Sequence, residues 1–417
     1  MALKRSIGLF ESVMYGVGLI VGAGIYVIIG QAAGLAGNAL WLSFLIASFV
    51  AILTGLAYAE LSTMFPKEAA EYHYVKNAFD KRLAFLVGWI IMCTDVFAIS
   101  TVALGFASYF SFFFPLSIPM VATCLVLFMA LVNFSGIRQS TEFNIILTGL
   151  SLLGLIIIIC AAVPHFGSVN YFSMSNGFRG LFMSAGLVFF AYLGFEDIVN
   201  MAEETKNPKK TIPKAIILSV LITTVLYILV AISVVSLASP SSLAASEAPL
   251  ALAVSKVFTN ADTILAIIAL CATASTVLIL SIVASRMIYG MASEGSLPRQ
   301  LSKIHKKTKT PYLAILLNTI IVIIFLNSKS LSVLASMTDF GIMLMFAVIN
   351  ASLIWLRYKQ PNRKRAFKVP LNIGKIPLPS LFGLLFCSVM LFSFPRNVIN
   401  LTLTILAFGF LVSFWNE

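Results

Sequence analysis

The stretch GLIVGAGIYVIIG, from Gly18 to Gly30, places Gly22-Ala23-Gly24 in the middle of an otherwise apolar run. Each glycine inside a helix costs roughly 1 kcal/mol relative to alanine. Three interpretations compete. The stretch is a nucleotide-binding loop, a close packing surface formed by Gly18 and Gly22, or a discontinuous helix whose unwound backbone binds something polar. The rest of the chain must distinguish them.

The composition indicates an integral membrane protein. Of 417 residues, 60% are hydrophobic and 11% are charged, so one soluble domain could not hide the apolar surface from water. Nearly uncharged stretches of about 20 residues are long enough to cross a hydrocarbon core of about 30 Å. The sequence predicts twelve of them, over residues 7–35, 39–64, 83–113, 117–134, 143–164, 180–201, 215–238, 263–290, 312–327, 331–356, 376–394 and 397–415.

The positions of the basic residues predict the orientation. If the N-terminus is cytoplasmic, 24 of the 28 Lys and Arg residues fall on the cytoplasmic side. The other side receives only Arg179, Lys256, Lys329 and Arg396. Both termini are therefore predicted to be cytoplasmic, in a multi-pass protein of the cell membrane. The N-terminal apolar segment is interrupted by Glu11 and is too long for a signal peptide, so it is expected to remain as the first helix.

A second glycine helps to interpret the first stretch. Gly194 lies near the middle of the sixth predicted span, directly before Phe195 and Glu196. Interrupted helices at equivalent places in two halves of a transporter indicate a substrate site between inverted repeats. The nucleotide-binding interpretation fails, because neither a preceding strand nor an acidic residue about 20 positions later is present. Close packing through Gly18 and Gly22 stays possible.

Several motifs carry a family resemblance. They are Gly22-Ala23-Gly24-Ile25, FAYLGFE (190–196), EETKNPKKTIP (203–213), SRMIYGMASEGSLP (285–298) and LRYKQPNRKRAFKVP (356–370). This pattern resembles the amino acid-polyamine-organocation superfamily of amino acid permeases. The resemblance implies an all-α integral membrane protein with twelve transmembrane helices. It implies a five-plus-five inverted repeat, residues 1–164 and 180–357, with discontinuous helices 1 and 6. Two C-terminal helices follow within 376–415.

The resemblance also implies how an amino acid would be held. Free N–H groups at a half-helix N-terminus attract its carboxylate, and these are assigned to Ala23, Gly24 and Ile25 beside Gly22. Unwound carbonyls would accept from its ammonium. The residues assigned to that role by position are Ile20, Phe190 and Leu193, next to Gly194.

Aromatic side chains are candidate gates of such a pocket. The candidates are Tyr26, Phe190 and Tyr192. In a chain with 34 Phe, packing against lipid or other helices is the better expectation for any single aromatic residue.

Carboxylates inside the predicted spans are candidate functional groups, because charges in lipid are rare. Asp95 is expected near mid-membrane as a proton carrier, a contact for a cationic substrate, or a structural hydrogen-bonding group. Glu196 directly follows the second break and is a candidate for protonation linked to opening and closing. Asp197 is expected to share that role.

Other polar residues have weaker assignments. Glu11 and Arg286 are proposed as an inner gate pair. Ser275 and Thr276 are candidate hydroxyl ligands for sodium, although such residues commonly pack helices together in membranes. Glu60 and Asp339 lie nearer the helix ends, where solvation or helix capping is expected.

The chain departs from the family in two places. Several proton-coupled relatives carry a fifth-helix Lys, which would fall at Gly149 or its neighbours, but no Lys lies between Arg138 and Arg179. Proton coupling through such a lysine is therefore excluded. In addition, Ala69-Ala70 replaces a usual glycine pair, which should change loop geometry rather than chemistry.

The expected function is secondary active transport of an amino acid or related amine by alternating access, either as ion-coupled symport or as exchange. The alternative is a non-transporting amino acid receptor or accessory membrane subunit of the same fold. The sequence does not indicate an enzyme, because the three histidines lie in loops or at span ends and no nucleophile has an obvious base. The prediction includes no resident cofactor, no metal site and no nucleic-acid partner. Coupling to H⁺ or Na⁺ and the oligomeric state are left open.

Overall fold

The computed structural model describes residues 7–67, 69–111, 113–246, 249–255, 261–326, 331–392, 394 and 396–415. The described part is almost entirely helical. Its longer helices are α1 Leu9–Ile20, α2 Ala23–Ala36, α3 Leu40–Met64, α5 Lys81–Ser111, α6 Ile118–Ser135, α7 Ile137–Ala162, α8 Gly177–Phe189, α9 Pro208–Leu237, α12 Ala261–Ser293, α13 Tyr312–Leu326, α14 Leu331–Lys359, α15 Leu378–Leu391 and α16 Arg396–Trp415.

Shorter elements connect these helices. They are α4 Ala70–Ala78, α10 Pro240–Ala245, α11 Pro249–Ser255, and the 3₁₀ helices η1 Gly37–Ala39, η2 Val163–His165, η3 Phe190–Tyr192, η4 Glu196–Met201 and η5 Arg299–Ser302. A two-stranded antiparallel hairpin joins β1 Asn372–Ile373 to β2 Ile376–Pro377. The helices α10 and α11 lie between α9 and α12.

Nine helical segments of the described chain are long and apolar enough to cross a membrane. The last two predicted spans correspond to α15 and α16, which meet at an angle of 113°. At 1.5 Å per residue, the 14 residues of α15 extend about 21 Å, less than the ~30 Å core. A multi-pass membrane protein is therefore supported, and the number twelve stays a prediction.

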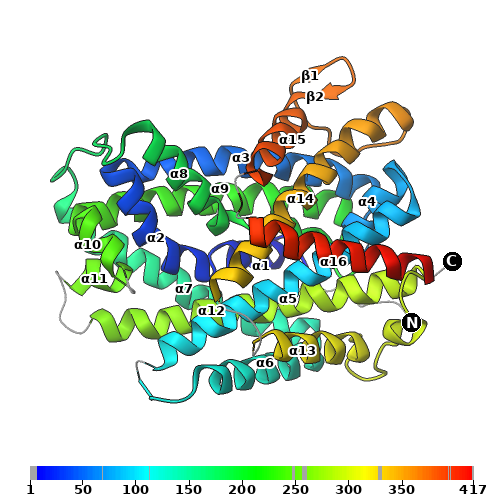
Figure 1. Cartoon of the computed structure of the whole chain (residues 1–417), viewed down its shortest axis with the longest axis horizontal. Helices are drawn as coiled ribbons and strands as arrows, with labels where there is room; N and C mark the ends of the chain where they lie inside the picture. Colours follow the sequence, from blue (N-terminus) through cyan, green and yellow to red (C-terminus); the bar gives the residue numbers. More distant parts are fainter. Residues whose placement is uncertain are drawn as a thin grey trace.

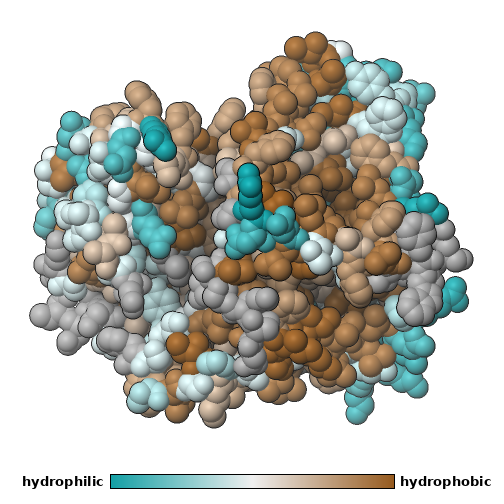
Figure 2. Space-filling view, viewed as in Figure 1, coloured by the Kyte–Doolittle hydropathy of each residue, from teal (hydrophilic) through white to brown (hydrophobic). Residues whose placement is uncertain are grey.

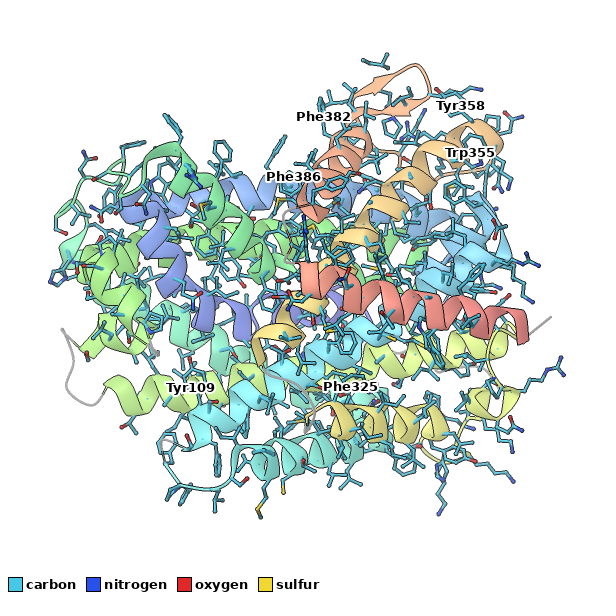
Figure 3. The ribbon with its side chains drawn as sticks, in the orientation of Figure 1. Tyr109, Phe325, Trp355, Tyr358, Phe382 and Phe386 are labelled. Atoms are coloured by element: carbon cyan, nitrogen blue, oxygen red, sulfur yellow. The ribbon has the colours of Figure 1, made fainter. Side chains whose placement is uncertain are left out.

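The helices run mostly along the long axis of the molecule (Figure 1). Among the helices long enough to cross a membrane, α12 is the most buried: 83% of an apolar stretch of 18 residues within it lies inside the protein. Hydrophobic side chains cover most of the middle of the visible face, and hydrophilic ones gather toward its two ends (Figure 2). Outward-pointing aromatic side chains such as Trp355, Tyr358 and Phe382 contribute to this surface (Figure 3). Such a surface suits a lipid bilayer.

The predicted break in the first span is confirmed. Helix α1 ends at Ile20, helix α2 begins at Ala23, and Gly22 between them is extended, with φ −91° and ψ −151°. Close packing also requires these glycines. A Cβ on Gly22 would overlap the Thr276 hydroxyl of α12, and a Cβ on Gly24 would lie 3.0 Å from the Ala191 Cα. The break and the tight packing are therefore two properties of one segment.

The second break is also confirmed. Helix α8 passes into η3, Leu193 is extended, and Gly194 has φ +112°, a conformation that only glycine adopts without strain. A Cβ at Gly194 would lie 2.5 Å from the Leu19 Cγ. Beyond the break the chain continues as the 3₁₀ helix η4 rather than as an α-helix. The two breaks thus contact each other through Leu19 and Gly194.

The expectation of a solvated Glu60 is wrong. Its side chain is fully buried and lies 2.5 Å from the Arg357 Nη2 and 2.9 Å from the Arg365 Nε. The Val369 N–H also donates to this carboxylate, at 2.7 Å. Arg357 near the end of α14 and Arg365 in the chain beyond it supply the charges that let the carboxylate of α3 be buried. For Asp339, one carboxylate oxygen is buried within α14.

The loop before α5 holds the two alanines that stand in place of the glycine pair. Ala69 has φ +49°, a left-handed conformation that costs an L-residue roughly 1–2 kcal/mol and that glycine adopts freely. The following N–H, of Ala70, donates to the Asn200 Oδ1 of η4 at 3.0 Å. Ala69 therefore keeps a glycine-like backbone, and α4 begins directly against η4.

Candidate functional site

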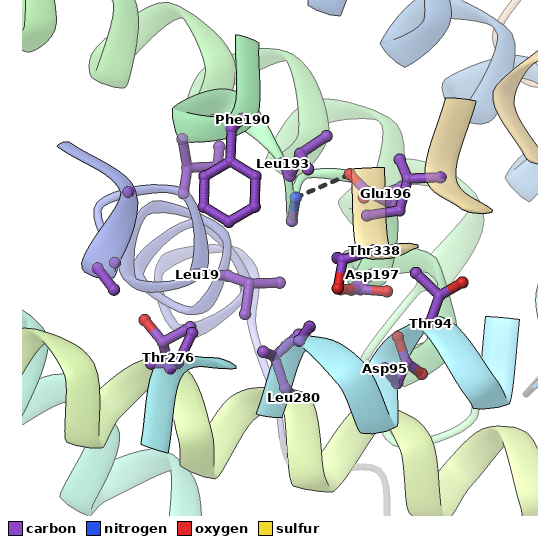
Figure 4. Close-up of a pocket in the computed structure, with 18 of the residues that line it drawn as sticks. Leu19, Thr94, Asp95, Phe190, Leu193, Glu196, Asp197, Thr276, Leu280 and Thr338 are labelled. Atoms are coloured by element: carbon purple, nitrogen blue, oxygen red, sulfur yellow. Dashed lines mark hydrogen bonds between the residues drawn. The ribbon is translucent and has the colours of Figure 1, made fainter. Parts of the chain in front are cut away.

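A cavity of about 730 Å³, open mouth included, lies where the two breaks meet. Parts of α5, α12 and α14 complete its wall (Figure 4). Eight of the predicted substrate-binding residues line it: Ile20, Gly22, Ala23, Gly24, Asp95, Phe190, Leu193 and Gly194. The ninth, Ile25, is buried but lies outside the lining.

Three carboxylates share this cavity. Asp95 comes from α5, and Glu196 and Asp197 come from the start of η4. All three are buried, with 6%, 3% and 7% of their surfaces exposed, respectively. In Figure 4 they lie on one side of the cavity with Thr94 and Thr338, whereas Phe190 and Thr276 lie on the other. The cavity therefore has an acidic side.

The break itself holds Glu196 in place. Its Oε2 accepts a hydrogen bond from the Gly194 N–H at 2.9 Å (Figure 4). The Gly194 carbonyl in turn accepts from the Asp197 N–H at 3.2 Å. The left-handed glycine thus turns its N–H toward the carboxylate, which links the position of Glu196 to the geometry of the break.

The opposite wall is formed by the start of α2. The first turn of a helix leaves N–H groups without helical partners and carries partial positive charge. Gly22, Ala23 and Gly24 line the cavity at this point. The carbonyl of Ile20, predicted to accept from a substrate ammonium, already accepts from the Tyr227 hydroxyl at 2.6 Å. A carbonyl oxygen has two lone pairs, so one remains for a ligand.

Tyr227 is a residue that the sequence interpretation missed. Its hydroxyl, on α9, lies 2.6 Å from the Ile20 oxygen and 3.0 Å from the Ala191 oxygen. One carbonyl from each break therefore lies within hydrogen-bond distance of this hydroxyl, whose single proton is donated to one of them or shared between the two. The ring of Tyr227 lies 5.4 Å from that of Phe44 and 5.3 Å from that of Tyr192. One tyrosine among twelve carries no local sequence signal that could have revealed this role.

The two tyrosines predicted as gates lie outside the cavity lining. The Tyr26 hydroxyl donates to the Ser151 carbonyl at 2.8 Å, and the Tyr192 hydroxyl donates to the Phe44 carbonyl at 3.1 Å. Both side chains are buried and tie neighbouring helices together. Packing, the alternative expected for single aromatics, describes them in this conformation. Phe190 does line the cavity.

The two hydroxyls proposed for sodium point to different neighbours. The Ser275 hydroxyl donates to the Asn144 Oδ1 at 2.6 Å and lies 3.3 Å from the Thr148 hydroxyl. Thr276 instead lines the cavity. Thr148 also faces Gly18, so it is Thr148, rather than its exposed neighbour Gly149, that occupies the place facing the first helix.

The proposed pairing of Glu11 with Arg286 is wrong. Glu11 accepts from the Gly8 N–H at 3.0 Å, at the start of α1, where a carboxylate favours the helix dipole. The Arg286 Nε lies 3.4 Å from the Glu204 Oε2, and both side chains are buried. Glu204 follows η4 directly, and its backbone carbonyl accepts from the Ile7 N–H at 3.2 Å. The arginine therefore holds the inner end of the sixth segment.

A further buried carboxylate lies next to η4. Glu71, in α4, accepts from the Asn200 Nδ2 at 3.5 Å. Burial raises the pKa of Glu71 to about 7, although its own backbone and Asn200 lower it by hydrogen bonding. Nearby, burial lowers the pKa of His73 to about 4, against the attraction of Glu294. Titratable groups thus continue from the cavity toward the end of the molecule where α4 lies.

Comparison with known proteins agrees with this geometry. The sequence model of an amino acid permease family matches residues 7–415. The chain belongs to this family. The match covers both breaks and every helix that lines the cavity of this amino acid permease.

Individual relatives of the permease carry different substrate names. It is 30% identical to the branched-chain amino acid permease BcaP of Bacillus subtilis, over 99% of this chain and 93% of the relative. It is 31% identical to the methylthioribose transporter of the same organism, over 94% and 89%. It is 33% identical to the chloroplastic cationic amino acid transporter 9 of Arabidopsis thaliana, over 73% and 58%.

Tyr227→Phe should lower both stability and transport. Without the hydroxyl, carbonyls at Ile20 and Ala191 lose a buried donor, at a cost of about 1–3 kcal/mol. Thermal unfolding of the purified permease in detergent should show a lower Tm, and reconstituted transport should fall. Tyr358→Phe, at an exposed tyrosine, is the matched control and should change neither. An unchanged Tm in Tyr227→Phe would contradict the role of the hydroxyl.

Glu71→Gln should change how stability depends on pH. Folding raises the pKa of this carboxyl from 4.5 to about 7. Its contribution to the stability of the folded state is therefore complete below pH 4.5 and is lost as the pH rises through 7. The glutamine variant lacks this loss. Between pH 4.5 and 7, the free energy of unfolding of the variant should therefore rise relative to that of the wild type by on the order of 3 kcal/mol. Parallel unfolding curves at pH 5 to 8 measure the difference, and a constant difference would rule out a buried titrating Glu71.

Proposed function

We propose that the permease is a secondary active transporter that moves an amino acid across the membrane by alternating access. The observation that carries this proposal is the cavity between two unwound segments, which offers helix N–H groups on one wall and carboxylates on the other. Backbone groups there match the carboxylate and ammonium that all amino acids share. The permease and transporter names of the relatives support transport over both a receptor and an enzyme.

In this proposal the carboxylate binds at the start of α2. Ala23 and Gly24 supply N–H groups there, with Ile25 next in the same turn. The ammonium is accepted by carbonyls at the two breaks, of Ile20, Phe190 and Leu193. Movement of one group of helices against another, with the five-plus-five repeat as the underlying architecture, then opens the cavity to each side in turn.

Coupling to H⁺ is proposed to use Glu196, with Asp197 beside it. Glu196 is buried, lines the cavity and is bonded directly to the left-handed Gly194. Gain or loss of a proton changes the charge that this backbone N–H meets, so protonation and the geometry of the break are linked. Coupling to Na⁺ is the alternative, with Ser275 and Thr276 as its candidate ligands.

Uptake of radiolabelled amino acids into proteoliposomes tests the function. The common amino acids and amines are offered with imposed pH gradients, sodium gradients and neither, together with counterflow from preloaded liposomes. We expect at least one amino acid to be accumulated or exchanged. Failure of every substrate under every gradient, with a well-folded protein, would remove transport and favour the receptor alternative.

Glu196→Gln should abolish accumulation driven by a pH gradient while preserving counterflow exchange. The amide keeps the shape and can still accept from Gly194, but it does not carry a proton. Uptake is measured from pH 5 to 8 with the substrate found above. Glu142→Gln, at an exposed carboxylate of α7, serves as the control and should retain the wild-type profile. A wild-type profile in Glu196→Gln would exclude Glu196 from coupling.

A further inference from the structure

We propose that the transported amino acid carries a positively charged side chain, as lysine and arginine do, and that Asp95 binds this charge. The inference rests on the proposed transport function and narrows its substrate class. Three features of the cavity support it. Its lining contains carboxylates but no basic side chain, and one buried carboxylate oxygen has no hydrogen-bond partner. Across the cavity, a polar wall is followed by an apolar strip and then by an acidic side.

The charges of the cavity are unbalanced. Asp95, Glu196 and Asp197 line it, and none of the described lining residues is Lys, Arg or His. Elsewhere in the fold, two buried carboxylates have cations: Glu60 has Arg357 and Arg365, and Glu204 has Arg286, whereas Glu71 has a hydrogen bond from Asn200. Burying an unpaired charge costs far more than burying a paired or protonated group. Because Glu196 and Asp197 are assigned to proton binding, Asp95 is the carboxylate for which the substrate supplies the cation.

Asp95 shows where that cation would bind. Its Oδ2 is buried and has no hydrogen-bond partner among the described residues, although a carboxylate this deep normally has one. On the same helix, the neighbouring Thr94 packs tightly against Gly341 of α14, where a Cβ would overlap its hydroxyl. This packing fixes the α5 backbone beside the cavity, so Asp95 occupies a defined position in the wall.

The order of surfaces across the cavity matches an amino acid with a charged end. The start of α2 forms one wall and suits the α-carboxylate. Leu19, Leu280 and Ile91 contribute apolar surface. In Figure 4, Leu19 and Leu280 lie between Thr276 and the acidic side chains. A methylene stem fits such a strip while its charged end reaches a carboxylate.

A neutral amino acid would leave the acidic side without a partner. Its single ammonium can be accepted by the carbonyls of the breaks, and its summed charge is zero. Lysine or arginine adds one positive charge at the far end of the stem. This second cation distinguishes the two substrate classes, since both share the groups that bind at the backbone.

Matched substrates test the inference. Norleucine has the lysine carbon chain without the terminal ammonium, and citrulline is a neutral analogue of arginine. The full-length permease is reconstituted, and the concentration of each compound that half-inhibits counterflow of labelled lysine is measured. We expect lysine and arginine to bind at least about 10-fold more tightly than norleucine and citrulline, respectively.

Asp95→Asn should selectively weaken the charged substrates. The variant keeps the shape and removes the charge, so lysine affinity should fall at least about 10-fold, while norleucine affinity stays within about twofold. Asp339→Asn is the matched control. It removes the same charge from α14, and its side chain lies outside the cavity lining. The control should keep the wild-type ratio of lysine to norleucine affinities.

The outcomes separate the two proposals. Transport of norleucine as well as lysine by the wild type would overturn the cationic substrate and leave the transport function intact. Equal loss of both substrates in Asp95→Asn would overturn the assignment of Asp95 to the side chain. Absence of all transport would instead defeat the transport proposal itself. If Asp95→Asn does not fold, the wild-type ratio of lysine to norleucine alone decides.

Discussion

Unwound backbone inside a membrane protein must find partners, because each unsatisfied N–H or C=O group in lipid costs several kcal/mol. The permease has two such segments in contact with each other, at Gly22 and at Gly194. The Tyr227 hydroxyl lies within hydrogen-bond distance of a carbonyl from each, and the Glu196 carboxylate accepts from one N–H. The backbone groups that these contacts leave free face the cavity. The proposed binding site is therefore made of backbone N–H and C=O groups whose hydrogen bonds the fold itself does not complete.

The glycines of the first break serve packing and recognition together. Gly22 lets the Thr276 hydroxyl approach, and Gly24 brings the first helix within contact of Ala191 at the second break. Side chains at these positions would push the two segments apart and fill the cavity between them. Helix packing through small residues and a discontinuous helix, which the sequence presented as competing interpretations, are therefore consequences of the same geometry.

The sixth segment is held from both ends by different chemistry. Near the cavity, the Gly194 N–H and the Tyr227 hydroxyl fix it. At its inner end, Asn200 accepts from the start of α4, and Arg286 pairs with Glu204. The first set consists mainly of neutral hydrogen bonds, whereas the second includes a buried ion pair.

The sequence by itself determined the membrane environment and both helix breaks, because hydropathy and interior glycines act locally along the chain. It also indicated Asp95 and Glu196, because carboxylates inside apolar spans are rare. The family resemblance extended this to the backbone at Ile20, Phe190 and Leu193. Only the tertiary structure decided which charges meet: Arg286 pairs with Glu204 rather than Glu11, and Glu60 is enclosed by Arg357 and Arg365. Tyr227 likewise acts on carbonyls more than 30 residues away in sequence. Such partners depend on how helices pack, and no local pattern records which side chains the packing brings together.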